Sequence, residues 1–209
     1  SAKAIAPIVL DLVRARSVVD VGCGVGAWLK AFAESGVERI LGIDGPWAGA
    51  QSLLIPPERF VARDLCRPLE IEETFDLVVS VEVAEHLPPE HAEGFVRSLV
   101  GLGPAVLFSA AIPFQTGVSH VNVQWPSYWA ARFAEHGYVA VDCIRPALWR
   151  NEDVVYWYAQ NLLLFVAESR IDGDPALAAA RTAHAGMPLD IVHPTMFLAR
   201  ADTSEMNWR

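Results

Sequence analysis

The stretch from residue 18 to residue 28, VVDVGCGVGAW, constrains the fold more than any other part of the chain. A short apolar run leads to Asp20, and glycines follow at Gly22, Gly24 and Gly26. A strand that enters a glycine-rich turn and then a helix brings backbone N–H groups close to a bound nucleotide. The pattern therefore predicts a nucleotide-type cofactor site at the carboxyl end of the first strand.

The negative charge of Asp20 distinguishes between cofactors with and without phosphate groups. The series Gly22-x-Gly24-x-x-Ala27 also satisfies the loose fingerprint of dinucleotide-binding turns. A pyrophosphate would meet the Asp20 carboxylate in a poorly screened cleft, which costs about a few kcal/mol. S-adenosylmethionine (SAM) carries a sulfonium and an ammonium group and no phosphate. We therefore expect SAM rather than NAD, and the alternative is a structural turn that Asp20 caps locally.

Composition and charge restrict the class of protein. The 209 residues, of which 53% are apolar and 20% charged, predict one globular domain. No stretch reaches the roughly 18 uncharged apolar residues of a membrane span. The opening SAKAIAPIVLDLVRAR carries charges within its apolar run, which favours an amphipathic helix over a signal peptide. We expect no membrane partner.

Cysteine usage and net charge add two further expectations. The three cysteines are far apart and form no CxxC pair, which is typical of a reducing cytoplasm and argues against a structural zinc site. The net charge of −9 lacks the basic balance of proteins that grip a phosphate backbone. The sequence thus predicts a cytoplasmic protein with no nucleic-acid partner.

Apolar runs alternate with helical stretches along the chain, which predicts an α/β layered fold. The near-continuous Val, Ile and Leu content of the runs indicates a sheet covered on both faces. Strands are expected at 16–22, 39–44, 59–65, 75–82, 104–111, 138–145 and 160–169, and helices at 27–35, 88–102 and 125–137.

Four motifs resemble those of class I SAM-dependent methyltransferases and occur in the expected order. They are DVGCGVG (20–26), ILGID (40–44), RDL (63–65) and FDLVVSVEVAEHLP (75–88). The resemblance covers about residues 15–168 and implies a three-layer, doubly wound seven-stranded sheet. The implied strand order is 3-2-1-4-5-7-6 with the seventh strand antiparallel. It also implies a methyltransferase domain over 1–168, with 169–209 as a C-terminal appendage or lid.

The resemblance assigns cofactor roles to particular positions. The glycines of the turn approach the methionine part of SAM, and Asp20 suits its ammonium group. Asp44 accepts hydrogen bonds from the ribose hydroxyls, whereas Asp64 and the Leu65 N–H contact the adenine; strand-end capping is the alternative for both aspartates. The expected cofactor residues are Asp20, Gly22, Gly24, Gly26, Asp44, Asp64, Leu65 and Val81.

The stretch SVEVAEHLPPEH holds the expected catalytic residues, Glu82 and His86. The spacing Glu-x-x-Glu-His, with His120 further along, resembles the metal-binding pattern of small-RNA 3′-end 2′-O-methyltransferases. Glu82, Glu85, His86 and His120 are therefore candidate ligands for Mg²⁺ or Mn²⁺, which would orient a diol and lower its pKa. Two alternatives stay open: His86 acts alone as a general base, or these residues only shape the loop and the cofactor pocket.

Aromatic side chains gather in the segments that border the acceptor pocket in this family. The expected acceptor contacts are His120, Trp125, Tyr128 and Trp157. Aromatic faces suit a sugar ring or a planar aromatic molecule. The leading interpretation is methyl transfer from SAM to a hydroxyl oxygen of a small-molecule acceptor, a sugar or natural product. An RNA 2′-O-methyltransferase and a non-catalytic SAM-binding protein are the alternatives, and the acidic balance argues against RNA.

Overall fold

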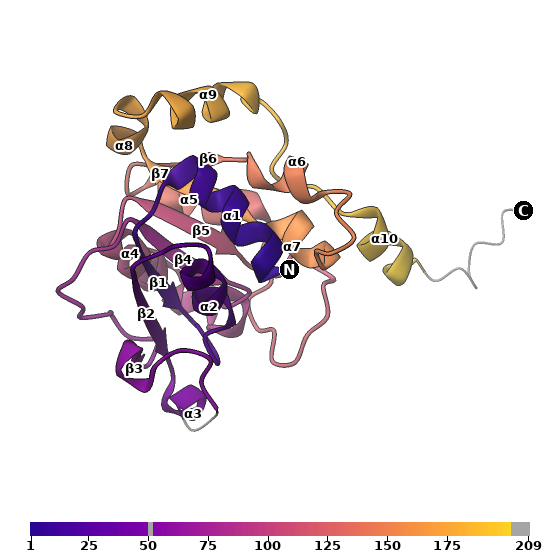
Figure 1. Cartoon of the computed structure of the whole chain (residues 1–209). Helices are drawn as coiled ribbons and strands as arrows, with labels where there is room; N and C mark the ends of the chain where they lie inside the picture. The colour runs from indigo at the N-terminus through magenta and orange to yellow at the C-terminus, as the bar shows by residue number, and fades with distance from the viewer. Residues whose placement is uncertain (50–51, 202–209) are drawn as a thin grey trace, which may run out of the picture.

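The computed structural model describes residues 1–49 and 52–201 and contains a seven-stranded sheet of order β3-β2-β1-β4-β5-β7-β6 (Figure 1). Neighbouring strands are parallel except at β7, which pairs antiparallel with both β5 and β6. The predicted strand order and the antiparallel seventh strand are confirmed. The strands are β1 (Ser17–Val21), β2 (Arg39–Asp44), β3 (Phe60–Ala62), β4 (Leu77–Val81), β5 (Ala105–Ser109), β6 (Tyr138–Val141) and β7 (Leu163–Ala167).

Helices cover both faces of the sheet, as the continuous apolar strands predicted. The helices are α1 (Ala2–Val13), α2 (Ala27–Glu34), α3 (Pro46–Gly49), α4 (Ala92–Leu102), α5 (Pro126–Ala134), α6 (Ile144–Leu148), α7 (Tyr156–Asn161), α8 (Glu168–Asp172), α9 (Pro175–Ala183) and α10 (Pro194–Arg200). On one face α1, α2, α6 and α7 pack against the sheet, and on the other α4 and α5 do so. All five β1 residues are buried, with Val18 in one core cluster and Val19 in the other.

Three predicted strands are at least four residues longer than the observed strands, because a turn or a helix takes the place of the extra residues. The predicted strand at 59–65 stops at Ala62, because the Asp64 carboxylate accepts the Cys66 N–H at 3.0 Å and turns the chain out of the sheet. The strand predicted at 138–145 stops at Val141 and is followed by α6. The strand predicted at 160–169 is β7 alone, with α7 before it and α8 after it.

The C-terminal segment after β7 contains three helices, α8, α9 and α10. Asp174 caps α9 through the Ala176 and Leu177 N–H groups, and buried Leu177 joins the core on the α1 face of the sheet. Figure 1 shows α9 beside β6, whereas α10 lies near α7 at the other side of the domain. The segment is therefore attached to the sheet, and positions 202–209 of the predicted appendage fall outside the described residues.

Within residues 1–49 and 52–201, no helix combines the length and the apolar character that crossing a membrane requires.

Candidate active site

The glycine-rich turn after β1 has the backbone that its sequence predicted. Gly22, Gly24 and Gly26 have φ angles of 87°, 53° and 86°, in the left-handed region that favours glycine. A Cβ at Gly22 would also collide with the Val83 side chain. The Gly22 N–H donates to the Ile43 carbonyl at 2.7 Å, so the turn is fastened to the end of β2.

Asp44, the last residue of β2, binds the glycine turn directly. Its carboxylate accepts the Gly24 N–H at 2.7 Å and the Gly45 N–H at 2.6 Å. Strand-end capping, the alternative role considered for Asp44, is therefore observed in the structure. A carboxylate has about four lone-pair positions, so each oxygen keeps one for a ribose hydroxyl.

A cavity of about 390 Å³ opens at the carboxyl ends of the parallel strands. Four predicted cofactor residues line it: Gly22, Asp44, Asp64 and Leu65. Trp47 of α3 adds an aromatic wall that the sequence did not single out. The other predicted cofactor residues, which the structure places outside the lining, are Asp20, Gly24, Gly26 and Val81.

Asp20 lies at the end of β1 with only 1% of its surface exposed. Its Oδ2 atom has no hydrogen-bond partner among the described residues. Burial, together with the charge of Asp44, raises the pKa of Asp20 to about 8. Burying an unpaired carboxylate is costly, so a ligand that brings an ammonium group to this position would be stabilised. The α-amino group of SAM has that charge.

The pKa of Asp20 predicts a pH dependence for the cofactor-free protein. An unfolded Asp has a pKa of about 3.9, so the folded chain holds an extra proton between about pH 4 and pH 8. Folding stability should then fall as pH rises through this window. At about pH 8, the free energy of unfolding of Asp20→Asn should exceed that of the wild type by about 5 kcal/mol, because each of about four pH units contributes about 1.4 kcal/mol; the Tm should be roughly 10–20 °C higher. The difference should shrink towards about pH 5.

Thermal melts of both proteins across the same pH range would check this expectation, with exposed Asp11→Asn as the control. Melting temperatures that stay parallel for the wild type and Asp20→Asn would contradict it.

Removing Asp44 should weaken cofactor binding. Asp44→Ala loses a charged acceptor, for which about 1–3 kcal/mol is the usual cost, and roughly 5- to 150-fold in affinity follows. Calorimetry with S-adenosylhomocysteine would measure the change, and Asp11→Ala should bind as the wild type does. An unchanged affinity would remove Asp44 from the ribose role, and heat from NAD would contradict the choice of cofactor.

Glu82 follows β4 with a φ of 56°, which is strained for a residue with a side chain. Its N–H donates to the Ser109 carbonyl at 3.0 Å. Its carboxylate accepts hydrogen bonds from Ser109 Oγ at 2.8 Å, Gln115 Nε2 at 2.6 Å and Asn161 Nδ2 at 3.1 Å. Because three donors from distant parts of the chain hold this carboxylate in place, we interpret Glu82 as a positioning residue rather than a base.

Three of the four candidate metal ligands converge beside Glu82. One ligand atom each from Glu85, His86 and His120 lies within 4.8 Å of the others, and Glu82 is outside this group. Glu85 is fully buried, and neither of its oxygens has a partner among the described residues. His120 Nε2 lies 4.0 Å from Glu85 Oε1. The rings of His86 and His120 meet edge to face with centroids 4.9 Å apart.

Both imidazoles are oriented by backbone carbonyls. His86 Nδ1 lies 3.3 Å from the Ser119 oxygen, and His120 Nδ1 lies 3.3 Å from the Gln115 oxygen. A carbonyl only accepts, so each Nδ1 carries the proton and each Nε2 keeps its lone pair. Partial desolvation and the nearby His120 lower the pKa of His86, which favours its neutral form. Histidines anchored in this way are typical metal ligands, and the three residues fit a divalent cation.

A second cavity, of about 310 Å³, lies against this cluster. Glu82 and His86 line both cavities, so the two meet there. The second cavity is lined by Glu82, Glu85, His86, Gln115, Thr116, His120, Tyr156, Trp157 and Tyr158. Because the predicted acceptor contacts His120 and Trp157 line it, we refer to it as the acceptor cavity.

The structure places only part of the predicted acceptor set on this cavity. His120 and Trp157 line it, but Trp125 and Tyr128 do not. The ring of Tyr128 lies under the Arg132 guanidinium at 3.5 Å and packs edge-on against Trp129. The physical reason is that α5 covers the face of the sheet opposite α7, which supplies the cavity aromatics.

Sequence reasoning missed the amide residues of the site. Gln115 and Asn161 are buried and hydrogen-bonded to each other at 2.8 Å, and both hold Glu82. An amide residue beside an apolar stretch, as in PFQT (113–116) and QNLLLF (160–165), was the sequence signal that could have identified them. Tyr156 and Tyr158, the aromatic neighbours of Trp157, are not among the predicted acceptor contacts, and all three residues belong to α7.

The comparisons with known proteins agree with this geometry. A family model described as a methyltransferase domain matches residues 2–141. No curated protein matches the chain. Among solved structures, the methyltransferase domain of bacterial CtHen1-C is 17% identical, with a TM-score of 0.58 over 79% of this chain and 97% of that chain.

Two further structures have the same fold. CalS10, an amino pentose methyltransferase from Micromonospora echinaspora, is 17% identical, with a TM-score of 0.61 over 79% of this chain and 91% of that chain. Magnesium protoporphyrin IX methyltransferase (ChlM) from Synechocystis PCC 6803 is 18% identical, with a TM-score of 0.55 over 80% and 83%. The chain therefore belongs to the methyltransferase domain family and is a class I SAM-dependent methyltransferase.

Proposed function

We propose that the protein transfers the methyl group of SAM to a hydroxyl oxygen of a small polyhydroxylated acceptor, a sugar or a glycosylated natural product. The observation that carries the proposal is the junction of the cofactor cavity with the acceptor cavity at Glu82 and His86. A hydroxyl group held in the second cavity can reach a methyl donor held in the first.

The reaction is an in-line displacement. The acceptor oxygen attacks the methyl carbon, the carbon–sulfur bond breaks, S-adenosylhomocysteine leaves and the hydroxyl proton is lost. The protein contributes by positioning the two reactants and excluding water. Glu85, His86 and His120 would hold a divalent cation, which when bound lowers the pKa of a neighbouring hydroxyl. Two imidazoles favour Mn²⁺ over Mg²⁺ in this set.

The chemistry of the acceptor cavity supports a sugar. Tyr156, Trp157 and Tyr158 supply aromatic surface, and Gln115 and Thr116 supply polar groups. A sugar ring has apolar faces and a rim of hydroxyl groups, which such walls complement. The shared fold of CalS10, described as an amino pentose methyltransferase, gives a precedent for this acceptor class.

RNA is the second candidate acceptor, and the Glu85, His86 and His120 cluster favours it. A cation there would suit a vicinal diol, which the 3′ end of RNA also carries. A structure described as small RNA methyltransferase HEN1 has the same fold, although this chain covers only 25% of it. Against RNA stand the net charge of −9 and the absence of Lys and Arg among the described residues that line the acceptor cavity.

A transfer assay with tritiated SAM would decide between the two acceptors. We expect label to pass to members of a mono- and oligosaccharide panel and not to short single-stranded RNA. RNA binding should be weak, because phosphate contacts need a basic surface. Labelled RNA, or tight and salt-sensitive RNA binding, would contradict the proposal.

A further inference from the structure

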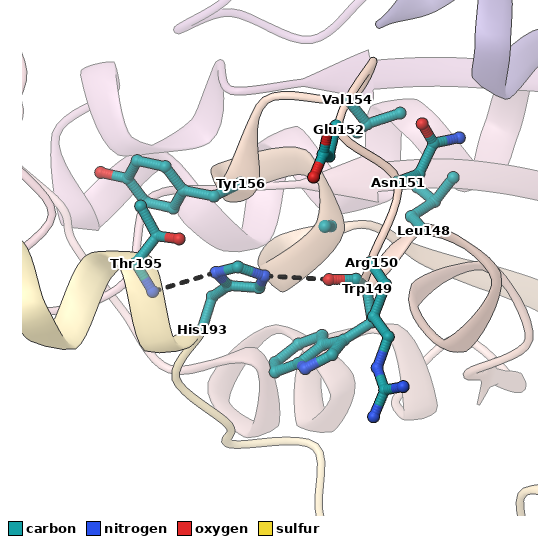
Figure 2. A pocket seen from close by; sticks show the side chains of 10 residues that line it. Leu148, Trp149, Arg150, Asn151, Glu152, Val154, Tyr156, His193 and Thr195 are labelled. Atoms are coloured by element: carbon teal, nitrogen blue, oxygen red, sulfur yellow. Dashed lines mark hydrogen bonds between the residues drawn. The ribbon is translucent and has the colours of Figure 1, made fainter.

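A third cavity, of about 520 Å³, lies between the α6–α7 connection and the segment that leads into α10. Figure 2 shows its walls, with Tyr156 at one side and Trp149 across from it. Tyr156 also lines the acceptor cavity, so the two cavities are neighbours. Its lining includes the aromatic and polar residues Trp149, Arg150, Glu152, Tyr156, His193 and Thr195.

The C-terminal wall of this cavity is held by His193. Its Nε2 lies 3.1 Å from the Trp149 carbonyl oxygen, and its Nδ1 accepts the Thr195 N–H at 3.2 Å (Figure 2). Nε2 therefore donates and Nδ1 accepts, which fixes a neutral imidazole. The Trp149 ring lies 4.7 Å from the His193 ring, and the Tyr156 ring stacks on the other side at 6.1 Å.

The same wall is anchored to the buried interior. The His193 N–H donates to Gln160 Oε1 at 2.8 Å, and Gln160 is fully buried. Gln160 Nε2 donates to Asn161 Oδ1 at 2.8 Å, and Asn161 in turn holds Glu82. A continuous set of hydrogen bonds thus joins this cavity to the active site. The arrangement is a built cavity and not a gap between loosely packed segments.

Several polar groups of the cavity remain available. Among residues 1–49 and 52–201, the side chains of Trp149, Arg150, Glu152, Tyr156 and Thr195 make no hydrogen bond or ion pair. These side chains provide donors and acceptors around aromatic surface, with one positive and one negative charge. Such a lining suits an uncharged ring bearing hydroxyl groups, whereas a phosphate chain would need more cations.

We propose that this cavity is a second acceptor subsite, which binds a neutral sugar ring adjacent to the ring that is methylated. The inference rests on the proposed function, and it specifies the acceptor further as an oligosaccharide or a glycoside with at least two rings. Tyr156, shared by both cavities, would contact both rings.

A glycan array probed with the labelled protein in the presence of S-adenosylhomocysteine would first identify the glycans that bind. The affinities of these glycans and of their component monosaccharides would then be measured by titration. The oligosaccharide should bind about tenfold more tightly than its monosaccharide. Trp149→Ala should remove this difference. Thr195→Val should reduce it while keeping the backbone N–H that holds His193, and exposed Glu135→Gln is the matched control.

Different outcomes would contradict the second subsite and the proposed function. Equal affinity for monosaccharide and oligosaccharide, or an oligosaccharide preference that survives both variants, would overturn the subsite alone. Binding of S-adenosylhomocysteine with no glycan of any length bound would overturn the sugar acceptor, and the subsite with it. Failure to bind S-adenosylhomocysteine would instead count against the proposed function as a methyltransferase.

Discussion

Glu85→Gln and His120→Ala should each abolish Mn²⁺ binding and slow methyl transfer by about 10²–10⁴-fold, and His86→Ala should behave like them. Each variant removes one of three ligand groups that lie within 4.8 Å of one another. A bound cation contributes several kcal/mol of charge stabilisation, which gives the size of the rate effect. Electron paramagnetic resonance of Mn²⁺ would count bound ions independently of any acceptor. Chelation should reproduce the loss, and Mn²⁺ should restore activity more fully than Mg²⁺.

His136→Ala is the matched control for this experiment. His136 and Glu93 also form an imidazole–carboxylate pair, with Nε2 and Oε1 3.1 Å apart, but they lie outside the cluster. The variant should keep both Mn²⁺ binding and activity. A different pattern would assign His86 as a lone general base: no effect of chelation, and a loss of about 10²–10⁴-fold confined to His86→Ala.

The sequence allowed the sheet and the location of the site to be predicted, because both depend on local patterns. A glycine turn such as 22–26 needs φ angles that few other residues adopt, so its motif is readable without tertiary information. Parallel strands bring their carboxyl ends to one edge, which is where Asp44 and Glu82 were expected and are found.

The roles of Glu82 and Glu85 could not be separated from the sequence. Both follow β4, and both belong to a spacing that resembles a metal site. Their difference depends on the left-handed backbone of Glu82 and on donors from Gln115 and Asn161, which are far away in the chain. Contacts between residues far apart in the sequence are not encoded by a local pattern. Only the folded chain therefore shows that Glu82 is held by amide donors whereas Glu85 joins the His86 and His120 cluster.

The boundaries around β7 were missed for the same reason. Residues 160–169 form an apolar run that resembles one strand, yet Gln160 and Asn161 end α7 with buried amides. These amides are stabilised by partners at Gln115, Glu82 and His193. Tertiary hydrogen bonds therefore stabilise a helix end at Gln160 and Asn161, although the local apolar pattern favours a strand.

Glu82→Ala should lower the free energy of unfolding by about 2–5 kcal/mol. The change leaves Ser109 Oγ and Gln115 Nε2 without an acceptor, whereas Asn161 Nδ2 keeps Gln115 Oε1. Each of the two unsatisfied buried donors costs about 1–3 kcal/mol. Alanine gains no relief of backbone strain, because it is no more stable than glutamate at a φ of 56°. Urea denaturation would measure the loss, with exposed Glu90→Gln as the control.

Glu82→Gln distinguishes a positioning role from metal ligation. The amide keeps the size of the side chain but turns an NH₂ group towards donors, so methyl transfer should fall while the fold persists. Because Glu85, His86 and His120 form the cluster without Glu82, this variant should still bind Mn²⁺ as the wild type does. Loss of Mn²⁺ from Glu82→Gln would instead make Glu82 a ligand of the same cation.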